Sequence, residues 1–387
     1  MSENTNIEGR QKLNRGEWSE LYVLLKLLGE GRLYSANALL QKNIQSYLNI
    51  LKIIRQEAKS DVLEYVVNVD ETVSVKTQST GDILVTLEKS DFISVANVLL
   101  EDMSTKKGVS IAASDIVYDF SEKIYVKNPK APAVKSLSKQ FGGKNDIFIE
   151  TSDPQTAIVS LMGFSIKSRY TKSQPTLFNA GTTSQFNFVL SNCDDRLMEE
   201  FNSIKDDKNH RDWERCKSFL KEHSIGLTFT ATKFEIYEDN LVLIRDRMAE
   251  IMAWCVKDRL IDADTDYGVM ETVQRLSNSN PLGVKRPDVY YEKAIKDLLM
   301  AGFSGMTAGT VWDGKEQVNG GYIVVMESGD VLCYHSTDRE SFRGYLFKNT
   351  HFEYVSTDKY NWGFIEKNGD KYYLPLNVSI RFNSKIR

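Results

Sequence analysis

The fold is decided by a stretch that reads Asp146-Ile-Phe-Ile-Glu-Thr-Ser-Asp-Pro-Gln-Thr-Ala-Ile-Val-Ser-Leu-Met-Gly-Phe-Ser-Ile-Lys-Ser168. Its outer parts are rich in Ile, Val and Phe, which favour strands, and its middle, 152–155, is rich in residues that favour turns. We therefore predict a β-hairpin. If the turn is centred just after Thr156, Asp146 lies across from Lys167, and a one-residue bulge would shift this pairing slightly. A carboxylate and an ammonium group then meet at one end of the hairpin.

This acid–lysine pair has two interpretations. Metal-dependent phosphodiesterases need such a pair, because a carboxylate binds Mg²⁺ while a nearby ammonium positions the attacking water. Similar pairs also occur on solvated sheet surfaces, where they stabilise only modestly. The charge distribution favours the first interpretation: residues 122–193 carry nine basic and four acidic side chains, in a chain whose net charge is −4. A local basic surface suits a polyanionic substrate, although a lysine-rich surface without a partner is the simpler alternative.

Length and composition narrow the class of protein. The chain has 387 residues, enough for two or three domains, and it contains no run of eighteen apolar residues, so no membrane span is expected. The four cysteines form no CxxC pair and the four histidines show no ligand spacing, so neither zinc nor a disulfide framework is indicated. A cytoplasmic protein is the simple reading. No Walker loop, GxGxxG or HExxH motif is present.

The order of elements predicts an α/β (α+β) protein. We expect a disordered tail over 1–13, a large domain with helical insertions over 14–300, and a β-rich C-terminal unit over 301–387. The first helix begins after Asn14, where Glu17 completes a capping box, and Glu20 lies one turn further in on the flank of the apolar stripe. Further along the chain we predict an apolar-faced helix over 36–59, a highly charged helix over 197–223, a strand pair over 225–236 and an amphipathic helix over 241–256.

A dense run of short hydrogen-bond donors follows the hairpin. Residues 169–187 are rich in Ser, Thr, Asn, Gln, Arg and Lys and contain no carboxylate. These residue types bind phosphates and base edges, which suggests a nucleic-acid contact. The alternative is an ordinary polar loop.

Several blocks together resemble the HpaII family of type II restriction endonucleases. They are Asn14-Arg-Gly-Glu-Trp-Ser-Glu-Leu-Tyr22, the Asp146 strand with Gly163-Phe-Ser-Ile-Lys-Ser168, Pro175-Thr-Leu-Phe-Asn-Ala180, Gly309-Thr-Val-Trp-Asp-Gly314, Gly320-Gly-Tyr-Ile-Val324 and Gly329-Asp-Val-Leu-Cys-Tyr-His335. The resemblance implies a PD-(D/E)XK nuclease core, a mixed sheet flanked by helices. It also implies Mg²⁺-dependent double-strand cleavage of DNA at CCGG or a related short palindrome, leaving 5′ phosphates.

The resemblance also assigns roles in the site. Asp146 matches the metal-binding acid, Lys167 matches the motif lysine, and the Ile166 carbonyl is a further metal ligand. The chain departs from the motif at Ser165, where an acid is usual and where serine cannot act as a charged ligand. Glu20 is expected to compensate, as in related nucleases that recruit a helix glutamate, with Glu17 as the second choice because it also has a capping role.

The resemblance implies partners as well. DNA contacts are expected from the side chains of Lys144, Ser168, Arg169, Lys172, Asn179 and Thr183, and a palindromic site implies a homodimer that acts beside a cognate DNA methyltransferase. Two other functions fit the residues: a DNA-binding protein whose nuclease activity is weakened by Ser165, and a structure-specific repair or junction nuclease. The residues leave open the recognised bases, the sensitivity to methylation and whether one or two metal ions act.

Overall fold

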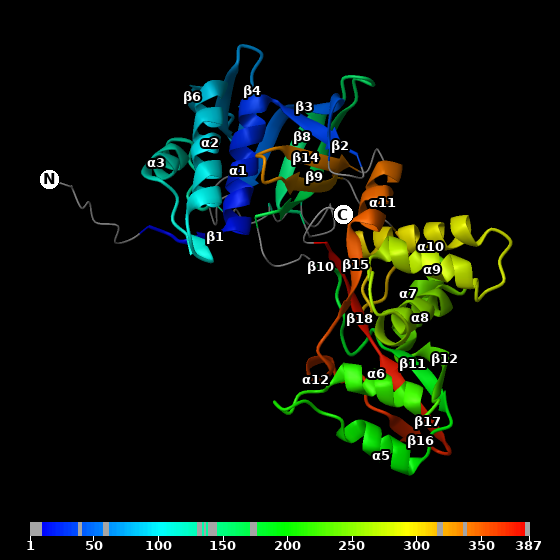
Figure 1. Ribbon diagram of the computed structural model, residues 1–387. Coiled ribbons are helices and arrows are strands. Elements are labelled where there is room, and N and C mark those ends of the chain that lie inside the picture. The colour runs from blue at the N-terminus through cyan, green and yellow to red at the C-terminus, as the bar shows by residue number, and fades with distance from the viewer. Residues whose placement is uncertain are drawn as a thin grey trace. The chain divides into compact units, whose positions relative to one another are not determined.

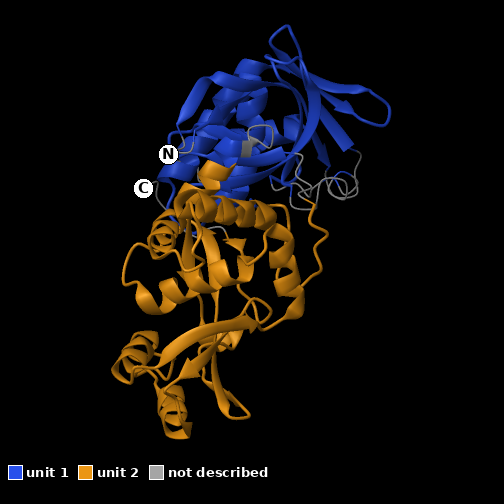
Figure 2. Cartoon of the chain, turned by 90° about the vertical axis from the view of Figure 1, so that its right-hand side faces the viewer, with its two compact units in different colours: residues 1–173, 317–342 blue, residues 174–316, 343–387 orange. Residues whose placement is uncertain are grey.

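The chain forms two compact units. The computed structural model describes residues 10–37, 41–56, 62–129, 134, 137, 145–170, 176–315, 320–335 and 339–383. Unit 1 consists of residues 1–173 and 317–342, and unit 2 of residues 174–316 and 343–387 (Figure 2). This division differs from the predicted ranges 14–300 and 301–387. The reason is that segment 320–335, expected to open a separate C-terminal unit, is part of the sheet of unit 1.

Unit 1 is built on a nine-stranded mixed sheet (Figure 1). Its strands are β2 (Arg32–Ala36), β3 (Lys42–Gln56), β4 (Val62–Val67), β5 (Thr72–Thr77), β6 (Ile83–Glu88), β8 (Ile147–Ser152), β9 (Val159–Ser168), β13 (Gly320–Val325) and β14 (Val331–His335). The order is β2-β14-β13-β9-β8-β3-β4-β5-β6, and β2 also pairs with β3, so six of the strands are paired in a closed circuit. The predicted hairpin, β8–β9, lies in the middle of this order.

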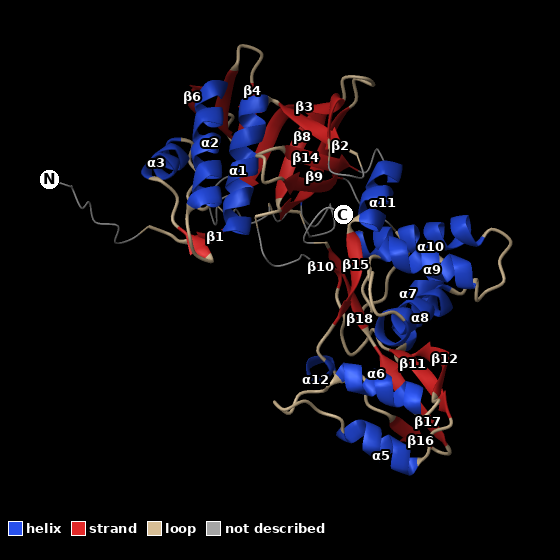
Figure 3. Ribbon diagram, viewed as in Figure 1, coloured by secondary structure: helices blue, strands red, loops and turns tan. Residues whose placement is uncertain are grey.

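Helix α1 (Arg15–Glu30) begins where its sequence predicts. Asn14 caps its first turn by accepting from the Glu17 amide, and Glu17 accepts from the Asn14 amide, so the predicted capping box is present. Gly31 ends the helix in the left-handed conformation, with a φ of 66°. The apolar face of α1 is buried, and α1 packs beside α2 (Lys89–Thr105) across the sheet (Figure 3). A third helix, α3 (Asp115–Lys123), contacts α2.

The predicted helix over 36–59 is wrong where the structure describes it. Residues 42–56 form the long strand β3, which pairs with β2, β4 and β8. Its leucines and isoleucines recur at spacings that fit a helix, but Ile50, Ile53 and Ile54 are β-branched and are buried within the sheet. Pairing on both sides of the strand therefore prevails over the helical spacing.

The predicted tail over 1–13 is partly ordered. Residues 1–9 lie outside the described part of the chain. Leu13, by contrast, is buried, and it belongs to the short strand β1 (Leu13–Asn14), which pairs with β7 (Ser110–Ile111).

Unit 2 combines two smaller sheets with helices. The sheets have the orders β12-β11-β17-β16 and β10-β18-β15, with strands β10 (Thr176–Phe178), β11 (Phe186–Ser191), β12 (Gly226–Thr232), β15 (Thr350–Tyr354), β16 (Glu366–Asn368), β17 (Lys371–Leu376) and β18 (Val378–Phe382). The helices are α5 (Asp195–Ser203), α6 (Trp213–Glu222), α7 (Glu235–Ile244), α8 (Met248–Lys257), the π-helical turn η1 (Asp258–Asp262), α9 (Val269–Ser279), α10 (Pro287–Phe303) and α12 (Thr357–Tyr360). Helix α11 (Arg339–Lys348) contains the point where the chain passes from unit 1 to unit 2.

Three predicted elements of unit 2 are corrected. The expected helix over 197–223 is two helices, because Asp212 accepts a bond from a backbone amide and starts α6 anew. The expected strand pair over 225–236 is β12 followed by the start of α7. The expected helix over 241–256 is divided between α7 and α8 by Arg247, whose φ of 61° no helix accommodates. In the described part of the chain no helix is both long and apolar enough to cross a membrane.

Candidate active site

The hairpin β8–β9 forms as predicted, but its register differs by two residues. Ile147 pairs with Phe164, so Asp146 lies next to Ser165 and not across from Lys167. The turn is centred earlier than expected, because the Asp153 amide donates to the Ile158 carbonyl. Side chains two residues apart on a strand share a face. Ser165 and Lys167 therefore lie on the same side of β9.

The Asp146 carboxylate is held by two donors. Its Oδ2 atom accepts from the Ile166 backbone amide at 2.7 Å and from the Ser165 hydroxyl at 3.0 Å. Its own backbone amide donates to the Phe164 carbonyl at 2.8 Å. The orientation of this carboxylate is therefore fixed relative to strand β9.

Two glycines, Gly163 and Gly320, allow close packing beside Asp146. A Cβ atom on Gly163 would lie 2.7 Å from the side chain of Asn145, the residue before Asp146. Strand β13 pairs in parallel with β9, and a Cβ atom on Gly320 would lie 1.7 Å from the Gly163 carbonyl oxygen. Gly320 leaves no room for a side chain because the Gly163 backbone blocks it, whereas a side chain at Gly163 would require the Asn145 side chain to shift.

Lys167 lies between a hydroxyl and an aromatic ring. Its Nζ atom donates to the Ser165 hydroxyl at 2.9 Å and lies 5.3 Å from the centre of the Tyr322 ring. Tyr322 is buried on β13, directly beside Ser165 in the sheet register. No role for Tyr322 was foreseen. The available signal was its place in the family-like block that begins at Gly320.

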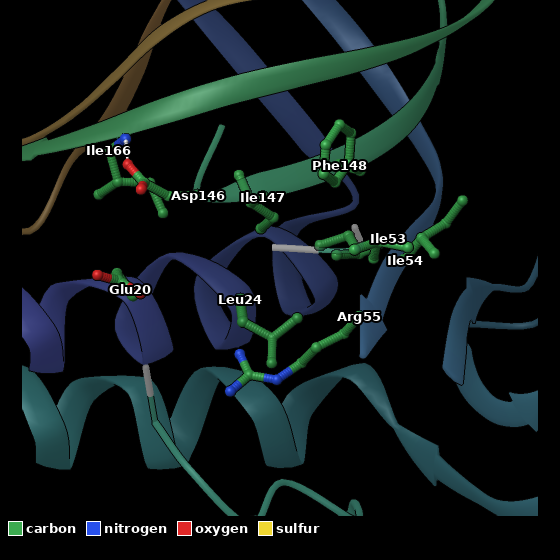
Figure 4. Close-up of a pocket in the computed structure, with 10 residues that line it drawn as sticks. Glu20, Leu24, Ile53, Ile54, Arg55, Asp146, Ile147, Phe148 and Ile166 are labelled. Atoms are coloured by element: carbon green, nitrogen blue, oxygen red, sulfur yellow. Dashed lines mark hydrogen bonds between the residues drawn. The ribbon is translucent and has the colours of Figure 1, made fainter. Parts of the chain in front are cut away.

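Glu20 on α1 lines the same cavity as Asp146 and Ile166. This cavity measures about 20 Å³, which is enough for a water molecule. Figure 4 shows Glu20 on the helix face that is turned toward Asp146 and Ile166. The helix is tied to β9 near this point, because Ser19 donates to the Ser168 hydroxyl at 2.7 Å. The structure therefore brings Glu20 and Asp146 to one cavity.

Two further residues clarify the site. Glu17, the second choice, does not line this cavity, and its carboxylate accepts from the Asn14 amide at 3.0 Å. Arg55, which no sequence argument singled out, does line the cavity, and its guanidinium donates to the carbonyls of Asn128 and Pro129. Arg55 was missed because its segment was predicted to be a helix rather than strand β3.

The residues of this cavity suit a hard cation such as Mg²⁺. Its acidic side chains are Asp146 and Glu20. An extended residue directs its N–H and C=O to the same side, so the Ile166 carbonyl faces the side from which Asp146 approaches. Oxygen ligands completed by water and phosphate are what Mg²⁺ prefers. Over the described residues, no cluster of three or more His, Cys, Asp and Glu could hold a metal ion.

The expected DNA-binding residues of unit 1 are only partly visible. Lys144 and Lys172 lie outside the described residues. The Ser168 hydroxyl accepts from Ser19 and from the Tyr170 amide, so it has a structural role. Arg169 is half-buried, and its backbone amide donates to the Val325 carbonyl of β13.

The expected DNA-binding residues of unit 2 lie between β10 and β11. Asn179 is exposed and Thr183 is half-buried. Their neighbours Ser184 and Gln185 are buried. The Ser184 hydroxyl donates to the Asn377 side chain, and the side-chain amide of Gln185 donates to two backbone carbonyls. Part of the donor-rich run therefore stabilises unit 2 itself.

Comparison with known proteins supports the predicted family. The model of the HpaII restriction endonuclease family matches residues 14–382. The type II restriction enzyme HpaII of Haemophilus parainfluenzae is 32% identical to this chain over 371 residues, which cover 95% of this chain and 98% of the relative. No solved structure matches. The chain therefore belongs to the HpaII family of type II restriction endonucleases, which are site-specific deoxyribonucleases.

Proposed function

We propose that this restriction endonuclease cuts DNA at the cavity between α1 and the β8–β9 hairpin. Asp146 and Glu20 bind Mg²⁺ there, together with the Ile166 carbonyl. The observation that carries the proposal is that Glu20 of the first helix lines one cavity with Asp146 and Ile166 of the hairpin. Mg²⁺ bound in this way supplies positive charge for the scissile phosphate and a more acidic bound water.

Lys167 has the complementary role. Its ammonium lies on the same face of β9 as Ser165. The Ser165 hydroxyl bonds both this ammonium and the Asp146 carboxylate. In this position the ammonium orients the water that attacks phosphorus and offsets the negative charge that develops on the phosphate. Attack in line with the 3′ oxygen releases that oxygen and leaves a 5′ phosphate.

The architecture supports a PD-(D/E)XK nuclease core. The acid and the lysine lie at one end of an antiparallel hairpin in the middle of a mixed sheet, and a helix that carries a glutamate packs against it. The chain departs from the motif at Ser165, and Glu20 supplies the second carboxylate in its place.

The substrate is double-stranded DNA with a short palindromic site, CCGG or a close relative of it, cut by a homodimer with one active site per strand. A cognate methyltransferase protects the host DNA. Lys144, Arg169 and Lys172, which lie just outside the hairpin in sequence, contact the phosphates, and Asn179 and Thr183 contribute contacts from unit 2, whereas Ser168 has the structural role described above.

A cleavage assay on plasmid DNA tests the proposal. With Mg²⁺ the wild-type enzyme should give discrete fragments whose ends reveal the site, and EDTA should prevent cleavage. Asp146→Ala and Lys167→Ala should abolish cleavage while DNA binding in Ca²⁺ persists. Glu150→Ala is the matched control, because Glu150 lies on β8 but pairs with Lys52 rather than lining the cavity. Full cleavage by the Asp146 or Lys167 variant would refute the assignment.

A further inference from the structure

Ser165 connects the two charged groups of the candidate site. Its hydroxyl lies 3.0 Å from Asp146 Oδ2 and 2.9 Å from Lys167 Nζ. The ammonium can only donate and the ionised carboxylate can only accept, so the direction of both bonds is determined. The hydroxyl accepts from Lys167 and donates its single proton to Asp146.

One carboxylate oxygen of Asp146, Oδ2, is occupied by hydrogen bonds within the protein. Oδ2 accepts from the Ser165 hydroxyl and from the Ile166 amide, and a carboxylate oxygen has about two acceptor positions. Oδ1 is therefore the oxygen of Asp146 that would hold a cation. A carboxylate that bridges two cations would have to give up at least one of the bonds to Oδ2.

The other acid of the cavity, Glu20, does not raise the number of cations that the site can hold. Glu20 is the second carboxylate that lines it, and within the described residues no third acid, histidine or cysteine joins them in a cluster that could hold metal. A second cation would need another charged ligand, and strand β9 has the neutral hydroxyl of Ser165 at that place.

The serine also restricts Lys167. The ammonium is held by Ser165 and lies over the ring of Tyr322, the residue that is paired with Ser165 in the sheet. Without the hydroxyl, the ammonium of Lys167 would lose its connection through Ser165 to Asp146. The distance between the ammonium and that carboxylate would then be less tightly set.

We infer that Ser165 is a positioning residue that sets Lys167 beside Asp146 and limits the centre to a single divalent cation. This inference rests on the proposed function of Asp146 and Lys167. It assigns to the serine a role of its own rather than that of a lost ligand.

Two measurements test it. The first is the number of Ca²⁺ ions bound per protomer, measured by calorimetry with the enzyme on a duplex that bears the site found by the cleavage assay. One ion is expected, and two would overturn the inference.

The second measurement compares substitutions at Ser165. Ser165→Ala should lower kcat about 10- to 100-fold, the usual effect of losing a group that orients a metal ligand, and should alter the pH profile of kcat. Ser165→Thr keeps the hydroxyl on a strand that favours β-branched residues and should restore most of kcat. DNA affinity in Ca²⁺ should change less than twofold in both variants. Ser160→Ala, on the same strand near the hairpin turn, is the control.

The outcomes separate this inference from the proposed function. If Asp146→Ala and Lys167→Ala are inactive while Ser165→Ala cuts at the wild-type rate, the positioning role fails and the assignment of the site stands. If Asp146→Ala retains full cleavage, the proposed function itself fails. Equal loss of kcat in Ser165→Ala and Ser165→Thr would also overturn the positioning role.

Discussion

Two glutamates of one helix, three residues apart, should separate stability from catalysis. Glu17 accepts from the Asn14 amide and closes the capping box of α1, whereas Glu20 lines the cavity with Asp146. We expect Glu17→Ala to destabilise the protein without impairing cleavage. We expect Glu20→Gln to impair cleavage without destabilising the protein.

The magnitudes follow from these contacts. Glu17→Ala removes one exposed hydrogen bond and a negative charge from the first helical turn, which together stabilise by about 1 kcal/mol. For a unit of this size that corresponds to a fall in Tm of about 2–4 °C. Glu20→Gln keeps the shape of a half-buried side chain, so the free energy of unfolding should change by less than about 0.5 kcal/mol.

For cleavage, Glu20→Gln should have the large effect and Glu17→Ala the small one. If Glu20 is a metal ligand as proposed, its loss should cost at least about 100-fold in cleavage rate, since even groups behind such ligands cost 10- to 100-fold. Higher Mg²⁺ concentration should restore part of this loss in Glu20→Gln. The assays are thermal unfolding followed by circular dichroism and plasmid cleavage over a range of Mg²⁺ concentrations. Normal cleavage by Glu20→Gln together with a large loss in Glu17→Ala would show that the two roles are exchanged.

Two further predictions concern packing and thiol chemistry. Gly163→Ala should destabilise by about 1–3 kcal/mol and also slow cleavage, because the new methyl group must displace Asn145 beside Asp146, the proposed metal ligand; an unchanged Tm would contradict the close approach. Burial raises the pKa of Cys216 to about 11 and also raises the pKa of Cys255, so both thiols stay neutral at pH 8. Partial burial also raises the pKa of Cys193, but its thiol is more accessible than the other two. Iodoacetamide should therefore alkylate Cys193 before either of them in the folded protein, as mass spectrometry of peptides would show, and early modification of Cys216 would refute the argument.

Local signals were sufficient for the elements that carry the site. The strand-rich and turn-rich parts of the hairpin predicted β8 and β9, and the capping box predicted where α1 begins. The register was wrong by two residues because Ala157 adopts a φ of 56° in the turn, a conformation that alanine rarely adopts and that its sequence does not signal. Asp146 and Lys167 are therefore not paired directly and are connected through the Ser165 hydroxyl.

Long-range pairing could not be predicted from the sequence. Strand β13 pairs with β9 although they are separated by all of residues 174–316, and no local pattern reveals such a partner. This is why Tyr322 was missed and why the predicted boundary near residue 300 does not coincide with the compact units. Strand β3 was missed for a related reason, since its conformation depends on partners on both sides.

The parallel pair β9–β13 has a consequence for how the enzyme folds. Parallel neighbours cannot be joined by a tight turn and need a long connection, which is usually a single helix. Here that connection is most of unit 2. A newly made chain cannot complete the sheet around Lys167 until more than 320 residues have left the ribosome. Prior folding of the intervening segment would shorten the gap between the two strands and lower the entropy cost of closing it.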